Sequence, residues 1–128
     1  MLSAESHGAK FQQEKETRMT ASQTKKEESP FVCNMLALNA EQRKRQSALI
    51  QNLRKAQTEI RELPDGYSFR FAGETAMIRD LGEFIANERL CCPFFEFTLK
   101  VEREGGPLWL NLTGREGVKL FIKTEFGF

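Results

Sequence analysis

A proline inside an apolar stretch divides the second half of this chain into a helical part and an extended part. Before Pro93, apolar residues recur every three or four positions, as on one face of a helix: Met77, Leu81, Phe84 and Ile85. After it, they alternate with polar residues, as on one face of a strand: Phe95, Phe97, Leu99 and Val101. Pro93 enforces this change because it donates no backbone hydrogen bond and keeps the preceding residue out of the helical region. We therefore expect residues 87–97 to join a helix to a strand.

This junction holds two of the three cysteines, Cys91 and Cys92, and Glu88 precedes them by one helical turn. Residues three and four positions apart are neighbours on a helix, so the three side chains should share one surface. The phase of the helix turns Glu88 and Cys91 toward the core. A carboxylate there is unfavourable unless it is hydrogen-bonded, paired with an arginine or bound to a cation.

The thiols have two interpretations that the sequence leaves open. Cys91 and Cys92 can offer two thiolates to a soft metal or metalloid ion, and Cys33 would add a third sulfur ligand, with Glu88 assisting. Alternatively, the cysteines are small apolar residues of the core, and the surrounding aromatic side chains keep them inert by raising their pKa. In that case Glu88 would pair with neighbours of Arg89 or with Arg115 at the surface. The distance from Cys33 to the pair separates the two interpretations.

The remaining pattern predicts an α+β two-layer sandwich in the order α-β-α-β-β-α. Asn39 and Gln42 form a capping-box pattern at the start of a helix that should run to about Glu62, before Pro64. Strands are expected at residues 66–71, 95–101 and 108–112, with helices at 75–90 and from 113 onward. Three strands then form a mainly antiparallel sheet with the helices on one face, and the last strand lies between the other two.

The first helix carries one apolar stripe, which consists of Leu49, Leu53, Ala56, Ile60 and Leu63. It spans about two heptads, which is shorter than the three or four typical of a coiled coil, so packing on its own domain is favoured over a helix-to-helix dimer seam. A three-stranded sheet nevertheless leaves open edges. These edges predict a homodimer.

The composition indicates one small domain, at 31–128, preceded by a flexible polar tail at 1–30. The tail holds five basic and five acidic residues and a single aromatic, Phe11, which is too little apolar surface to offset the entropy of ordering it. The only histidine, His7, lies in this tail. We therefore expect it to be a solvated residue rather than a catalytic or metal-binding one.

Charge and motifs exclude several classes of function. The chain has 128 residues and a net charge of +1, which gives no reason to expect nucleic acid or an anionic membrane as a partner. It has no apolar run of about 20 residues for a membrane span and no apolar core of a signal peptide, so we expect a cytoplasmic protein with reduced thiols. No Cys-x-x-Cys, phosphate-binding glycine loop or nucleophile elbow is present. A thiol-dependent enzyme would also need a base, and no obvious one exists.

Several blocks of the sequence resemble a group of small uncharacterised bacterial proteins. The blocks are residues 63–67, 88–94 (Glu-Arg-Leu-Cys-Cys-Pro-Phe), 106–110 and 112–119. The run Glu-Arg-x-Cys-Cys-Pro-Phe is the most specific of them, and Cys33 with the helix after it belongs to the same pattern. The likeness covers about residues 31–125 and implies the domain limits and a bacterial cytoplasmic setting. It implies no substrate, because the group has no established activity.

Two functional hypotheses follow. The first is a non-catalytic, thiol-based binder or sensor of a soft metal or metalloid ion at Cys33, Cys91, Cys92 and Glu88. The second is a dimerisation or interaction module whose cysteines belong to the core. The identity of an ion or other ligand cannot be derived from the residues.

Overall fold

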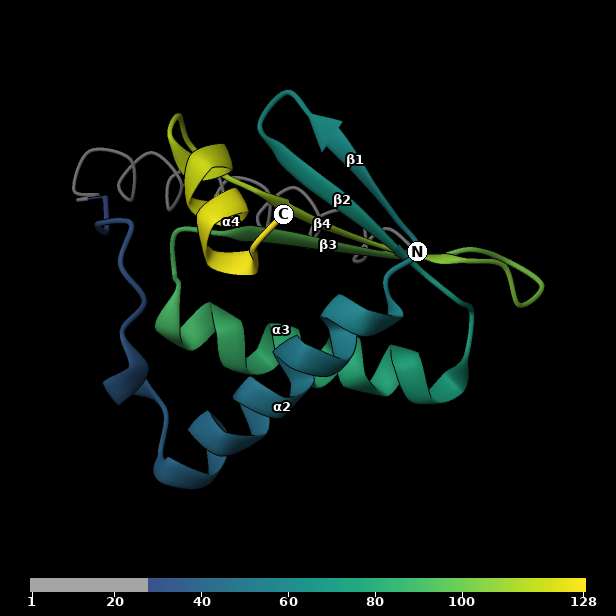
Figure 1. Ribbon diagram of the computed structural model, residues 1–128, viewed down its shortest axis with the longest axis horizontal. Helices are drawn as coiled ribbons and strands as arrows, with labels where there is room; N and C mark the ends of the chain where they lie inside the picture. Colours follow the sequence, from purple (N-terminus) through teal and green to yellow (C-terminus); the bar gives the residue numbers. More distant parts are fainter. Residues whose placement is uncertain (1–27) are drawn as a thin grey trace, which may run out of the picture.

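The computed structural model describes residues 28–128, which build helices against one antiparallel sheet (Figure 1). A single 3₁₀ turn, η1 (Met35–Ala37), comes first. The further elements are α2 (Ala40–Ala56), β1 (Glu59–Leu63), β2 (Gly66–Phe71), α3 (Thr75–Cys91), β3 (Glu96–Val101), β4 (Leu108–Thr113) and α4 (Val118–Phe126). Most of the expected tail, with His7, lies outside the described residues. The order α-β-β-α-β-β-α confirms the α+β class.

The sheet has four strands in the order β1-β2-β4-β3, and every neighbouring pair is antiparallel. The predicted position of the last strand, between the other two, is therefore confirmed. The predictions of three strands and of the order α-β-α-β-β-α are wrong, because the first helix ends at Ala56 and not near Glu62. The chain instead forms β1, which pairs with β2 through the two-residue turn Pro64-Asp65.

The core lies on the face of the sheet that the three helices cover. The inward side chains of the two central strands are Tyr67, Phe69, Phe71, Leu108, Leu110 and Leu112, all of them buried. The ring of Phe126, on α4, lies 6.4 Å from that of Phe69 on the sheet and 6.2 Å from that of Phe84 on α3. α4 therefore shares its face of the sheet with α3, as predicted for helices on one face.

Helix α2 packs along α3 below the sheet in the view of Figure 1. Leu49 and Leu53 are only 1% and 6% exposed, so the apolar stripe of α2 packs on its own domain and is not a free dimer seam. The predicted capping box is also confirmed, because the backbone N–H groups of Asn39 and Gln42 each donate to the other residue's side chain over 2.8 Å.

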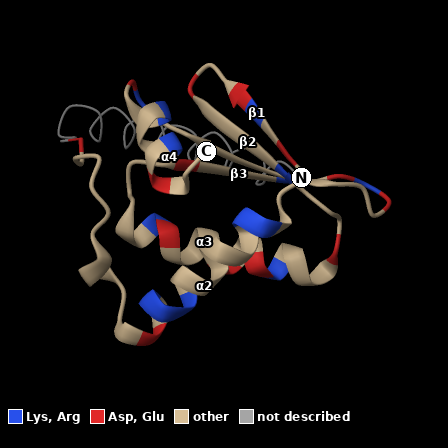
Figure 2. Ribbon diagram, in the orientation of Figure 1, with Lys and Arg blue, Asp and Glu red and all other residues tan. Residues whose placement is uncertain are grey.

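Charged residues of both signs are mixed over the helices (Figure 2). The basic side of α2 is partly neutralised by α3, since Arg45 lies 2.8 Å from Glu83 and 3.4 Å from Asp80. None of the helices in residues 28–128 is long and apolar enough to span a membrane.

Candidate metal centre

The last turn of α3 brings together the three residues that the sequence places at the proline junction. The backbone N–H of Cys92 donates to the Glu88 carbonyl over 2.7 Å as the final bond of the helix, and Pro93 prevents its continuation. Glu88, Cys91 and Cys92 are 3%, 1% and 0% exposed. One ligand atom from each lies within 4.8 Å of the others. We call these three residues the thiol–carboxylate cluster.

Hydrogen bonds from neutral groups hold the carboxylate of this cluster. The Cys91 thiol donates to Glu88 Oε1 over 3.3 Å, and the two sulfurs are 3.9 Å apart. From α2, Gln46 Nε2 donates to Glu88 Oε1 over 3.3 Å and to the Phe84 carbonyl over 3.1 Å. Glu88 has no ion pair with any lysine or arginine of the described chain.

The expectation that Glu88 pairs with Arg115 at the surface is therefore wrong. Arg115 instead contacts the segment that leads into the domain. Its guanidinium lies 3.0 Å from Glu28, donates to the Ser29 carbonyl and covers the ring of Phe31 at 4.1 Å. Glu88 is therefore a buried acid without a cationic partner among residues 28–128.

Burial and mutual repulsion favour the protonated forms of the cluster. Desolvation raises the pKa of Glu88, and hydrogen bonds from Cys91 and Gln46 only partly oppose it. Burial and the neighbouring Glu88 charge raise the pKa of Cys91 to about 12. The pKa of Cys92 is also raised, by its interaction with the Cys33 thiol and by burial. Without a cation, both thiols of the cluster are therefore protonated and unreactive at neutral pH.

Cys33 lies at the margin of the cluster and not within it. The backbone N–H of Asn34 donates to the Cys91 carbonyl over 2.8 Å, which fixes the segment before η1 against the end of α3. The half-buried Cys33 thiol donates to Glu125 of α4 over 3.8 Å. It is close enough to influence the pKa of Cys92 but does not belong to the 4.8 Å group. A role for Cys33 as a ligand stays a prediction.

Gln46 was not predicted as part of the site. Its side chain is 1% exposed, and its Oε1 has no hydrogen-bond donor within the part of the chain that the structure describes. The sequence contains a signal for it, because Gln46 precedes Leu49 by three positions and so continues the apolar stripe of α2. A polar residue inside such a stripe must find a buried partner, which here is Glu88.

The arrangement offers two sulfurs and one carboxylate oxygen, a donor set that suits a soft or borderline cation. Among the described residues, the carboxylate of Glu88 accepts a hydrogen bond from the Cys91 thiol, and burial raises the pKa of this carboxyl group. No protein-family model, curated protein or solved structure matches this chain. The geometry of the thiol–carboxylate cluster is therefore the ground for a functional proposal.

Proposed function

We propose that this protein binds a soft metal or metalloid ion at the thiol–carboxylate cluster. The observation that carries the proposal is the convergence of three buried ligand atoms, one each from Glu88, Cys91 and Cys92, within 4.8 Å of one another. In this proposal Cys33 moves from its contact with Glu125 to supply a further sulfur. The function is binding or sensing in the cytoplasm of a bacterium, in line with the resemblance in sequence, rather than catalysis.

A cation would relieve two unfavourable features of the site. Within the described part of the chain, Glu88 is a buried acid held only by neutral donors, and an ion at the cluster would compensate its charge and those of the thiolates. The Gln46 Oε1 acceptor is buried and has no donor among residues 28–128. A water molecule bound to the ion would supply such a donor, as ordered waters do for buried polar groups elsewhere.

The ligand types select the kind of ion. Thiolate ligands favour zinc, copper(I) and similar soft ions, whereas calcium and magnesium require sets of six or more oxygens. Three protein ligands, with Cys33 as a fourth, would also suit the tetrahedral coordination of zinc. Zinc and cadmium are therefore the appropriate probes.

The second candidate function is an interaction module whose cysteines are core residues. The observation that favours it is the raised pKa of Cys91 and Cys92, together with their nearly complete burial. Both candidates place the thiols in an apolar environment. They differ in whether the folded, reduced protein takes up an ion.

Chelator competition on the reduced full-length protein separates the candidates. We expect one zinc or cadmium ion per chain, and at least two of Cys33→Ser, Cys91→Ser and Cys92→Ser should lose about tenfold or more in affinity while remaining folded. Ser68→Ala is the matched control, because Ser68 is a buried polar residue of β2 whose hydroxyl bonds to Asn111, outside the cluster. Its affinity should equal that of the native protein. If the native protein binds neither ion, and the serine variants differ only in stability, the cysteines are core residues.

A further inference from the structure

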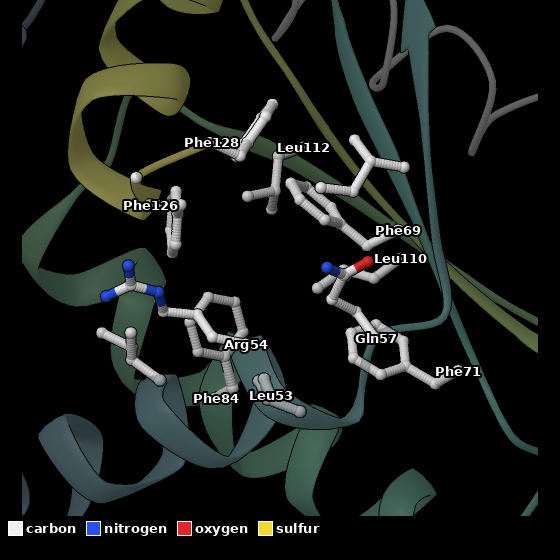
Figure 3. A pocket seen from close by; sticks show the side chains of 13 residues that line it. Leu53, Arg54, Gln57, Phe69, Phe71, Phe84, Leu110, Leu112, Phe126 and Phe128 are labelled. Atoms are coloured by element: carbon white, nitrogen blue, oxygen red, sulfur yellow. The ribbon is translucent and has the colours of Figure 1, made fainter.

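A cavity of about 270 Å³ lies between the sheet and the ends of α2 and α4, apart from the thiol–carboxylate cluster (Figure 3). Five phenylalanines contribute to its wall: Phe69 and Phe71 from β2, Phe84 from α3, and Phe126 and Phe128 at the C-terminal end. Leucine and isoleucine side chains from α2, β1 and β4 complete the apolar part. Its volume lies just below the range of about 300–1,000 Å³ common for small-molecule sites, and its apolar, aromatic lining is of the kind that such sites have.

Two polar side chains enter this apolar wall, and both come from the end of α2. They are the Arg54 guanidinium and the Gln57 amide, which Figure 3 shows among the rings. Arg54 is exposed, so the cavity reaches the surface beside it. The wall contains no Asp or Glu, and Arg54 forms no ion pair with any carboxylate in residues 28–128. The cavity therefore combines an apolar interior with one positive charge at its opening.

We propose that this cavity binds a small monocarboxylate with an apolar body, either an aryl-alkanoate or a medium-chain fatty acid. The guanidinium presents paired N–H donors that match the two oxygens of a carboxylate, and the Gln57 amide adds a further donor. The phenylalanine and leucine side chains then desolvate the hydrocarbon part of the ligand. A cationic ligand would meet the charge of Arg54, and a sugar would leave its hydroxyl groups unpaired against the apolar wall.

Phe84 contacts both the cavity and Gln46, the residue that donates to Glu88 of the thiol–carboxylate cluster. The ring of Phe84 lines the cavity, whereas its backbone carbonyl accepts the hydrogen bond from Gln46, which also holds Glu88. No residue of the cluster lines the cavity. The carboxylate site and the proposed ion site therefore use different side chains.

Calorimetric titration of the full-length protein tests the proposal with two matched pairs of compounds. The acids are 3-phenylpropionate and octanoate, and the neutral controls are 3-phenyl-1-propanol and 1-octanol, which keep the same apolar bodies. We expect saturable 1:1 binding of at least one acid, with its alcohol at least about tenfold weaker, because the charge-assisted bonds to Arg54 are lost.

Substitution locates the site. Arg54→Met keeps the apolar stem and should abolish the preference for the acid, whereas Lys55→Met removes a neighbouring charge that does not line the cavity and should leave the affinity unchanged. Ile60→Phe fills the cavity from β1 and should weaken acid and alcohol alike. The proposal is overturned if neither acid binds saturably, if each acid and its alcohol bind equally well, or if Arg54→Met and Lys55→Met have the same effect.

Discussion

Glu88 lies in an environment that is unusual for a glutamate, because it is buried. Glu88 is 3% exposed, and within residues 28–128 its carboxyl group has only the Cys91 thiol and the Gln46 amide as hydrogen-bond donors. Charged carboxylates are almost never fully buried without a cationic partner. Burial therefore raises the pKa of Glu88, and the folded protein without an ion binds a proton more tightly there than the unfolded chain does.

This shift predicts how stability changes with pH. The stabilisation from protonated Glu88 is fully present below the unfolded pKa of about 4.3 and is lost as the pH rises through the higher folded pKa. Glu88→Gln has no such loss, so its unfolding free energy relative to the native protein should increase with pH above about 4.3. Urea denaturation of both proteins with chelator, at a series of pH values, measures this difference. A difference that is constant with pH would contradict the raised pKa.

The two thiols predict a steep pH dependence of ion binding. The pKa of Cys91 is about 12 and that of Cys92 is raised as well, so both are protonated at neutral pH and each must release its proton to the solvent on binding. Each released proton changes the affinity about tenfold per pH unit, so these two thiols alone should weaken binding at least about a hundredfold for each unit of decrease below pH 8. Chelator competition at pH 6.5, 7.0 and 7.5 measures the slope. An affinity independent of pH would show that the thiols are not ligands.

Among the elements, strand β1 is the one that the sequence pattern wrongly predicted as part of a helix. Ile60 and Leu63 continue the three- and four-residue spacing of Leu53 and Ala56, so the helical period extends through a segment that is a strand. Pairing decides the outcome, because the N–H of Thr58 donates to the Arg70 carbonyl over 2.8 Å and the Pro64-Asp65 turn places β1 beside β2. Such tertiary contacts override local periodicity.

The same limit applies to the two sites. The spacing of Glu88, Cys91 and Cys92 on one helix is local information, and the structure confirms their convergence. The contact of Gln46 with Glu88 joins two helices, and the cavity beside Arg54 is lined from six elements and the C-terminal residues. Neither arrangement can be derived from spacing along one segment.

Alanine substitutions at two glycines test the assigned strand and helix, because they should change the unfolding free energy in opposite directions. A Cβ at Gly66 would lie 1.9 Å from the Leu112 carbonyl oxygen, whereas a Cβ at Gly82, within α3, would meet nothing within 4 Å. Gly66→Ala should therefore lower the unfolding free energy by about 3 kcal/mol or more, because β2 and β4 must separate. Gly82→Ala should raise it by about 0.5–1 kcal/mol through higher helix propensity. Denaturant unfolding measures both, and equal effects would contradict the assigned pairing of β2 with β4.

At the scale of the whole molecule, the sheet has two edges, β1 and β3, that no other strand within residues 28–128 covers. Glu59, Arg61 and Glu62 give β1 three charged residues out of five, which disfavours pairing with another chain. β3 has two charged residues out of six, and its last residue, Val101, is an apolar side chain that is 51% exposed. We propose that a homodimer, as expected from the open edges of the sheet, forms through β3.

Light scattering tests this association. The native protein should have twice the chain mass of 14.7 kDa, and Val101→Lys should return it to the monomer by placing a charge at the edge. Leu120→Lys is the control, because Leu120 is 73% exposed but belongs to α4. A native protein that stays monomeric at high concentration would exclude the dimer, and equal dissociation by both variants would move the interface away from β3.

X-ray absorption at the zinc edge shows which atoms surround an ion bound by Glu88, Cys91 and Cys92. On the reduced, full-length protein loaded with one equivalent of zinc, we predict three sulfur ligands at about 2.3 Å, from Cys33, Cys91 and Cys92, and at least one oxygen or nitrogen ligand at about 2.0–2.2 Å. A third sulfur that disappears in Cys33→Ser would assign Cys33 as a ligand. Zinc surrounded only by oxygen and nitrogen, or a protein that retains no zinc after gel filtration, would contradict the proposed binding.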